Sequence, residues 1–359
     1  MTKTYTYQQM GVAFESDDPL SPLPENFASW VHGTVAYDED DDKFVVFYNV
    51  NPGHDISRCS VMMTRKDPEG GFSPPVIIAS KKAVESMKTQ AAGIAANGDY
   101  LVLAGVFPWG DAVSKRTDIY RSCDKGVSWS VDTMRDSADG EEITAFNGDA
   151  SGFLVLSSGR IITLAVEPAP SYLTRIFYSD DNGTTWKKSS IAGNPTDVTE
   201  PAWAQLPDGT IICMARAAVR HGDTSQQIPA KFFQSFDAGE TWTEPQDSTS
   251  ITDFTLSNGE MIVRDDVDEI EFIHHSRFVQ PDGYSSLYVS RATFADAKAD
   301  KFSPQLKIGK LAGNVDYDDG RGDSGYVGAR LSKSGLINVF YYNGRRTAAN
   351  IHYAVGRKR

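Results

Sequence analysis

The chain has few cysteines, no surplus of basic residues and no long apolar run. Its three cysteines in 359 residues show no metal-ligand spacing, which excludes a disulfide framework and a cysteine zinc site. With 48 acidic and 35 basic residues the net charge is −13, so no basic stripe exists to follow a phosphate backbone. No segment is apolar enough to insert into a membrane, and the start Met1–Tyr5 does not resemble a signal peptide. We expect a soluble chain without a cleaved leader.

What the sequence does contain is a repeat. The pattern Ser-x-Asp-x-Gly-x-x-Trp occurs at Ser122–Trp129, Ser179–Trp186 and Ser235–Trp242, and its serines recur at almost equal intervals. A period of this length indicates stacked or radially arranged units. The residue types suit a hairpin turn, because Asp bonds nearby backbone N–H groups, Gly accepts a positive φ, and Trp packs back against the sheet.

Weaker copies extend the repeat to six units. Ser290 follows Ser235 at nearly the same interval but without the Gly and Trp, and Thr64–Gly70 is a degenerate copy before the first motif. A sixth unit follows residue 320, and Tyr5–Phe14 supplies a strand that closes the ring. The sequence therefore predicts an all-β, six-bladed β-propeller with four antiparallel strands in each blade.

The rest of the pattern agrees with one such domain over residues 1–359. Short β-rich runs are bounded by Gly, Asp or Asn, as in Gly209–Met214. No long amphipathic helix is evident, and Ser80–Ala91 is at best a short one. We also expect the motif tryptophans to be structural plugs rather than ligand contacts.

A propeller brings residues from separate blades together at the mouth of its channel. The first strand of a blade is expected to start roughly 35 residues before its turn motif, and four polar side chains hold that position: His32, Glu200, Arg277 and Tyr326. Arg216 lies at the end of the strand that follows Glu200 in the same blade. The sequence thus predicts a carboxylate, two guanidinium groups, a phenol and an imidazole at one mouth.

These residues and motifs resemble the sialidase (neuraminidase) superfamily, whose six-bladed propellers carry such Asp-box turns. The segment Glu200–Arg216 is similar to the family's stretch from the catalytic glutamate to an arginine, and Arg277 is similar to its later carboxylate-binding arginine. Ser324-Gly325-Tyr326 resembles the segment that bears the tyrosine nucleophile. The resemblance covers essentially the whole chain and implies a glycosidase acting on α-linked sialic acid.

The roles that the resemblance implies are chemically consistent. A tyrosine avoids the charge repulsion that a carboxylate nucleophile would meet at a sugar acid, and Glu200 would accept the phenol proton of Tyr326. Arg216 and Arg277 would hold the sugar carboxylate through bidentate hydrogen bonds. Asp55, in the loop after the second strand of the first blade, is the candidate acid/base. This chemistry requires no cofactor and no metal.

One departure points to a subgroup. Exo-acting sialidases begin their first blade with an arginine, whereas this chain has His32-Gly33-Thr34. That pattern resembles the phage endosialidases, tailspike enzymes that cut polysialic acid internally, and implies an acidic capsular polysaccharide as substrate. Trp109 and Trp203 are candidate platforms for such a polymer. The tailspike resemblance also implies a homotrimer and, for a phage protein, a place on the virion.

Other interpretations stay open at this point. The chain could be an exo-sialidase that uses Asp55, Tyr326 and Glu200, or an inactive propeller that only binds glycans. Glu200 and Arg216 could form a purely structural ion pair, and Tyr326 could pack between blades. His274 and His275, which flank Arg277, are expected to lie at the rim or to pack in the core rather than bind a metal.

Overall fold

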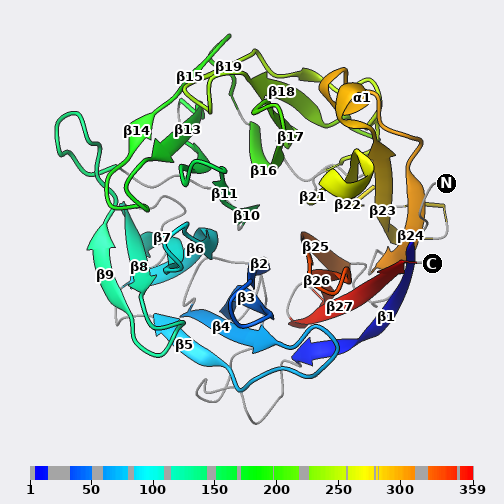
Figure 1. Ribbon diagram of the computed structural model, residues 1–359, viewed down its shortest axis with the longest axis horizontal. Helices are drawn as coiled ribbons and strands as arrows, with labels where there is room; N and C mark the ends of the chain where they lie inside the picture. Colours follow the sequence, from blue (N-terminus) through cyan, green and yellow to red (C-terminus); the bar gives the residue numbers. More distant parts are fainter. Residues whose placement is uncertain are drawn as a thin grey trace.

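Six sheets surround a central axis as the blades of a propeller in the computed structural model (Figure 1). Five of these sheets have four strands and one has five. The predicted all-β, six-bladed propeller is confirmed. The structure describes residues 5–14, 33–50, 60–79, 85–108, 115–143, 151–167, 171–196, 198–217, 226–255, 258–278, 280–281, 283–311, 322–345 and 348–358.

The strands of each blade follow one another from the axis outward. Blade 1 contains β2 (Gly33–Asp38), β3 (Lys43–Val50), β4 (Ser60–Lys66) and β5 (Val76–Ala79). Blade 2 contains β6 (Glu85–Ile94), β7 (Tyr100–Pro108), β8 (Arg116–Ser122) and β9 (Ser130–Thr133), with β10 (Ser151–Gly152) added parallel to β6. Blade 3 contains β11 (Leu154–Val155), β12 (Ile161–Val166), β13 (Thr174–Ser179) and β14 (Lys187–Lys188).

The other three blades follow the same order. Blade 4 contains β16 (Val198–Gln205), β17 (Ile211–Ala217), β18 (Lys231–Ser235) and β20 (Gln246–Asp247). Blade 5 contains β21 (Gly259–Arg264), β22 (Glu269–Ser276), β23 (Ser285–Ala292) and β24 (Leu306–Leu311), with the short helix η1 (Asp265–Val267) between its first two strands. Blade 6 contains β25 (Gly322–Leu331), β26 (Ile337–Arg345), β27 (Ala348–Lys358) and β1 (Tyr5–Phe14).

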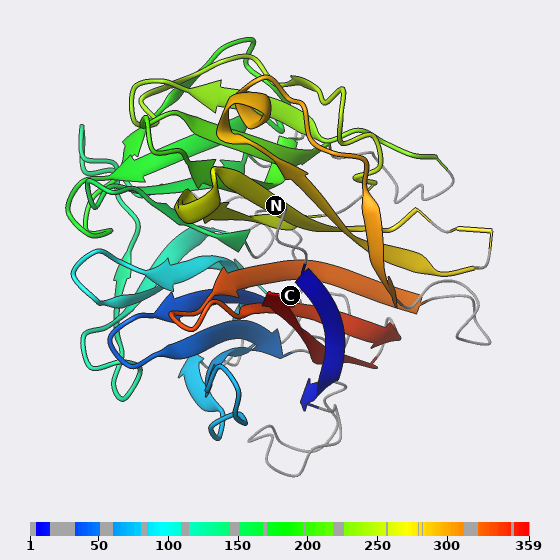
Figure 2. The same ribbon diagram turned by 45° about the vertical axis from the view of Figure 1, so that its right-hand side comes forward.

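The two ends of the chain close the ring in blade 6. Strand β1 pairs antiparallel with β27 in a register that runs from Tyr5 opposite Lys358 to Phe14 opposite Ile351. Figure 2 shows the blue β1 along the outer edge of this blade, beside the red C-terminal strands. The predicted closing strand Tyr5–Phe14 is therefore confirmed. Because the ring closes through hydrogen bonds between distant parts of the sequence, the relative placement of all blades is constrained.

The three Asp-box motifs form nearly identical turns between the third and fourth strands of their blades. In the third motif, Asp237 accepts hydrogen bonds from Ser235 Oγ at 2.9 Å and from Thr241 N at 2.9 Å, and Ser235 Oγ accepts from Gly239 N at 2.8 Å. Gly239 has φ +86°, and an added Cβ would lie 2.4 Å from Ile162 Cδ1 of the preceding blade. The glycine thus provides both the turn conformation and the close contact between blades.

The motif tryptophans pack inside, as predicted, but to different depths. Trp186 is fully buried and Trp242 is 3% exposed, whereas Trp129 is only half-buried. A further pair of short parallel strands, β15 (Ser190–Ile191) and β19 (Thr241–Trp242), joins blades 3 and 4 at this level. The Asp boxes therefore link neighbouring blades together.

This difference in depth predicts a difference in stability. Replacing Trp186 with alanine should lower the free energy of unfolding by about 3–5 kcal/mol, because it leaves a large cavity in a closed core. Trp129→Ala, made in the same motif position, should cost clearly less since that ring already contacts solvent. Chemical denaturation of both variants measures their free energies of unfolding. An equal decrease in the two variants would show that the burial of the tryptophan ring does not determine its contribution to stability.

One local prediction from the sequence was incomplete and another was wrong. The stretch after Ser290 forms the short helix α1 (Phe294–Lys298), whose first turn is capped by the side chain of Thr293. After this helix, Asp300 accepts hydrogen bonds from Ser248 Oγ at 2.7 Å and Thr249 N at 2.6 Å, and so links blade 5 to blade 4 without an Asp box. The stretch considered at best a short helix is a strand, β6, from Glu85 onward.

The inner strands define two different mouths of the channel. The last or next-to-last residue of each of the six inner strands lines one cavity of about 430 Å³: Tyr37, Ile94, Val155, Gln205, Val263 and Leu331. We call that end the rear mouth. The inner strands therefore begin at the opposite end, which we call the entry mouth, and the predicted site residues Glu200 and Tyr326 lie in the earlier parts of β16 and β25.

Candidate active site

Glu200 lies on a kink in the inner strand of blade 4. Thr199 pairs with Arg216 and Ala202 with Met214, so Glu200 and Pro201 form a bulge opposite a single residue. Glu200 has φ +49°, a left-handed conformation that costs a non-glycine residue about 1–3 kcal/mol. Pro201 suits such a position because a bulge has no ladder hydrogen bond for it to lose. The kink places a carboxyl group that is only 2% exposed inside the channel wall.

Tyr326 lies on a matching kink in blade 6. The register shifts between Gly325 and Gly328, and Tyr326 has φ +46°. The next residue is fixed from blade 5, since Val327 N donates to Asn258 Oδ1 at 2.9 Å. The Tyr326 hydroxyl of blade 6 donates to Glu200 Oε1 of blade 4 at 2.9 Å. Two strained residues that are 126 positions apart in the chain therefore meet in one hydrogen bond.

Arg216 completes this pair. Its Nη1 donates to the same Glu200 oxygen, Oε1, at 2.7 Å, and its side chain is 16% exposed. Its Nε is buried and has no hydrogen-bond partner among the described residues. Among the described residues, the guanidinium group is thus held by Glu200 through Nη1 while its Nε stays without a hydrogen bond.

The prediction that Arg277 lies on the first strand of a blade is wrong, because it follows β22, the second strand of blade 5. Its side chain is held from blade 6. Its Nε donates to the carbonyl oxygen of Ser324 at 3.0 Å, and its Nη2 donates to the hydroxyl of Tyr342. Tyr342 in turn stacks on Tyr326, with ring centroids 5.7 Å apart and planes inclined at 29°. The structure therefore joins Arg216, Glu200, Tyr326 and Arg277 in one continuous set of contacts drawn from three blades.

The other predicted site residues are not part of this set. His32, Asp55 and Trp109 lie outside the described residues. Trp203 is 4% exposed, donates its indole N–H to Gly152 O at 3.2 Å and packs beside Trp242 at 6.5 Å. A platform for a sugar ring needs an exposed face, so we do not retain the prediction that Trp203 binds substrate. Trp203 also lines the cavity at the rear mouth.

The two histidines before Arg277 are buried packing residues, as expected. His274 stacks on Phe272 with ring centroids 4.8 Å apart, and burial lowers its pKa to about 3. His275 Nε2 lies 3.1 Å from the hydroxyls of Ser285 and Ser324. In the part of the chain that the structure describes, no group of three or more His, Cys, Asp or Glu side chains is arranged to hold a metal ion.

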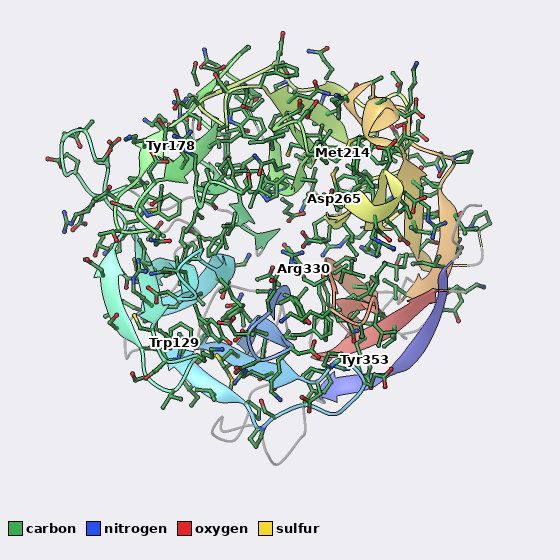
Figure 3. All side chains as sticks on the ribbon, in the orientation of Figure 1. Trp129, Tyr178, Met214, Asp265, Arg330 and Tyr353 are labelled. Carbon is green, nitrogen blue, oxygen red and sulfur yellow. The ribbon has the colours of Figure 1, made fainter. Side chains whose placement is uncertain are left out.

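The cavity at the rear mouth contains a second buried acid–arginine pair. Arg330 Nη1 lies 2.6 Å from Glu260 Oε1, and Figure 3 places Arg330 at the centre of the ring of blades. Burial raises the pKa of Glu260, although the adjacent Arg330 opposes this. None of the residues in the Glu200–Tyr326 contact set lines this cavity, so this hollow and the candidate chemistry lie at different ends of the channel.

Tyr342 was not predicted from the sequence, although a signal for it exists. Tyr342 follows Tyr326 at the same offset at which Arg216 follows Glu200. In both blades the later residue pairs with the residue just before the bulge, Thr199 in blade 4 and Gly325 in blade 6. Blades 4 and 6 therefore present their functional groups through the same local geometry.

The family of the chain follows from the repeat and the fold. Asp-box turns on a six-bladed propeller define the class, and the family model of the BNR repeat-like domain matches residues 42–263, more than half of the chain. The chain belongs to this family. No curated protein sequence matches it significantly. Within the described residues, no helix has the length and apolar character needed to cross a bilayer.

Solved structures share the fold at low sequence identity. A protein of unknown function from Dyadobacter fermentans is 17% identical, with a TM-score of 0.74 over 98% of this chain and 99% of that one. The NanB sialidase of Streptococcus pneumoniae is 14% identical, with a TM-score of 0.70 over 97% of this chain and 70% of that one. The leech intramolecular trans-sialidase is 13% identical, with a TM-score of 0.68 over 98% and 70%. At these identities the likeness shows the fold alone.

Proposed function

We propose that this protein is a glycosidase that cleaves α-linked sialic acid, with Tyr326 as nucleophile and Glu200 as its base. The observation that carries the proposal is the pair of hydrogen bonds on Glu200 Oε1, from Tyr326 at 2.9 Å and from Arg216 at 2.7 Å. The distance to the phenol lies within the range for direct proton transfer. The fold shared with the NanB sialidase and the leech trans-sialidase agrees with this chemistry.

The first step would form a bond between the phenol oxygen and the anomeric carbon. As Tyr326 attacks, its proton moves to Glu200 and the glycosidic C–O bond breaks. The leaving oxygen must gain a proton, and Asp55 remains the predicted donor. In the second step a water adds to the anomeric carbon, the bond to Tyr326 breaks, and the phenol recovers its proton from Glu200. The water's proton goes to the conjugate base of the acid, and two inversions retain the configuration.

The two arginines explain why the proposed substrate is a sugar acid rather than a neutral sugar. Tyr326 is linked to one guanidinium group through Glu200 and to another through Tyr342. Such surroundings favour a substrate that carries an anion on the reacting carbon, where a carboxylate nucleophile would be repelled. Arg216 approaches this point from blade 4, and Arg277 approaches from blade 5, held there by Tyr342 of blade 6. Arginine is suited to the task because its planar fork matches a carboxylate in two parallel hydrogen bonds.

Cleavage inside a polymer is the finer proposal. It rests on His32 in the place where exo-acting sialidases carry an arginine, and on the resemblance to phage endosialidases. A homotrimer and a polysialic acid substrate belong to the same proposal. An exo-sialidase that releases terminal sialic acid, using Asp55 as acid, is the alternative within the same chemistry.

One assay separates these functions. The purified chain should convert polysialic acid first into oligomers, with little release from a small fluorogenic α-sialoside, and chromatographic sizing of the products over time shows this. Early release of monomeric sialic acid from both substrates would support exo action instead. Binding of the polymer without any turnover would contradict the proposed enzyme and favour a glycan-binding propeller.

A further inference from the structure

Tyr342 contacts both Arg277 and Tyr326, and the proposed mechanism gives it no role of its own. It is on β26 and 1% exposed, its hydroxyl accepts a hydrogen bond from Arg277 Nη2, and its ring stacks on that of Tyr326. A single buried side chain thus contacts the proposed carboxylate-binding arginine with its polar end and the proposed nucleophile with its ring.

The backbone around Tyr342 is shaped for this contact. Gly325 has φ +149°, and an added Cβ would lie 3.3 Å from His275 Nδ1, 3.5 Å from Arg277 Nη2 and 3.5 Å from Tyr342 Cε1. Only glycine adopts that φ readily. The glycine therefore allows the arginine, the histidine and the phenol to close around the strand that carries Tyr326.

A buried hydroxyl cluster holds the other side of Arg277. Ser324, whose carbonyl oxygen accepts from Arg277 Nε, has its hydroxyl 2.9 Å from Ser285 Oγ and 3.1 Å from His275 Nε2. Ser324 is 2% exposed, and both of its partners are also buried. Arg277 is consequently held at two different nitrogens, by a fixed carbonyl and by Tyr342. Two such bonds set the plane of a guanidinium group, since its donors are coplanar.

We propose that Tyr342 is a positioning residue that sets the orientation of Arg277 toward the substrate carboxylate and couples it to the nucleophile Tyr326. The inference rests on the proposed function and deepens it. In blade 4 the residue opposite the start of the bulge is Arg216, which bonds Glu200 directly. In blade 6 the residue at the equivalent position is Tyr342, which acts through its hydrogen bond with Arg277. Recognition of the sugar acid therefore depends on a residue that does not touch the sugar.

The test is the variant Tyr342→Phe, which removes the hydroxyl and keeps the ring that stacks on Tyr326. A hydrogen bond to a charged group contributes about 1.5–3 kcal/mol, so KM for an α-sialoside should rise by roughly 10-fold or more. The change in kcat should be smaller, roughly 3-fold at most, because Tyr326 and Glu200 keep their contact. A loss caused by general damage to the fold would instead lower kcat and the melting temperature together.

A second readout isolates the carboxylate. The unmodified protein should bind a sialic acid ligand with a free carboxylate much more tightly than the methyl ester of the same ligand. In Tyr342→Phe the ratio of the Kd of the ester to the Kd of the free acid should fall by roughly 10-fold. The combined variant Arg277→Lys with Tyr342→Phe should show no loss beyond that of Arg277→Lys, because both act on one interaction.

The neighbouring residue provides the matched control. Tyr341 is also on β26 and 4% exposed, but it packs in the core on the other face of the strand, and burial raises its pKa to about 12. Tyr341→Phe should leave KM and the ester ratio unchanged. If the unmodified protein is active and Tyr342→Phe changes neither KM nor the ester ratio, the inference is wrong while the proposed function stands. If the unmodified protein neither cleaves nor binds sialosides, the proposed function fails and the inference fails with it.

Discussion

Replacing Glu200 with glutamine should lower kcat by roughly 10²–10⁴-fold, the usual contribution of a general base. Glutamine has the same shape and can still accept the hydrogen bond from Tyr326, but it cannot take the phenol proton. Arg216 would also lose its charged partner at 2.7 Å. Steady-state kinetics on the polymer and on a small sialoside measure the loss.

The chain offers a closely matched control for this experiment. Glu260 is likewise a buried glutamate on an inner strand, paired with Arg330 at 2.6 Å, but it lies in the cavity at the rear mouth. Glu260→Gln breaks the same kind of buried ion pair and should destabilise the protein comparably. Its kcat should stay within roughly 3-fold of the unmodified protein. Equal loss of activity in both variants would assign the effect to stability and would remove Glu200 from its proposed role.

Replacing Tyr326 with phenylalanine should lower kcat by roughly 10³-fold or more, because the bond-forming oxygen is absent. Phenylalanine keeps the ring stacked on Tyr342, so the fold and the orientation of Arg277 should persist. The binding of a sialic acid ligand should therefore change little. The double variant with Glu200→Gln should be no slower than Tyr326→Phe alone, since the two residues act as one unit. Additive losses, or a Tyr326→Phe variant with near-normal kcat, would contradict the assignment.

The architecture was predictable because its signals are local. In each Asp box Ser, Asp and Gly bond to one another within a single turn, and in the third box the tryptophan N–H also bonds inside the turn, so the motif specifies its conformation locally. Their regular spacing then fixes the blade count. The unit without these residues, after Ser290, was correctly placed but its helix α1 was not expected. There the link to blade 4 is made by Asp300, which carries no repeated pattern around it.

The candidate site was only partly predictable because strand bulges and side-chain directions decide it. The equivalent positions of Glu200 and Tyr326 in their blades indicated that they would approach each other, and their contact at 2.9 Å agrees with that expectation. Trp203 was expected as a platform for a polymer because of the endosialidase resemblance, and the structure buries it beside Trp242. Tyr342 could be found only through the offset it shares with Arg216, or through the contact itself.

Trapping of the covalent intermediate tests the central claim most directly. A sialosyl fluoride with a second fluorine beside the anomeric carbon slows both steps by opposing the oxocarbenium-like transition state, while its good leaving group lets the first step proceed. We expect the intact protein to gain the mass of one glycosyl group, peptide mapping to place it on Tyr326, and Tyr326→Phe to gain none. Turnover of sialosides with no adduct, or with an adduct on a different residue, would contradict the account.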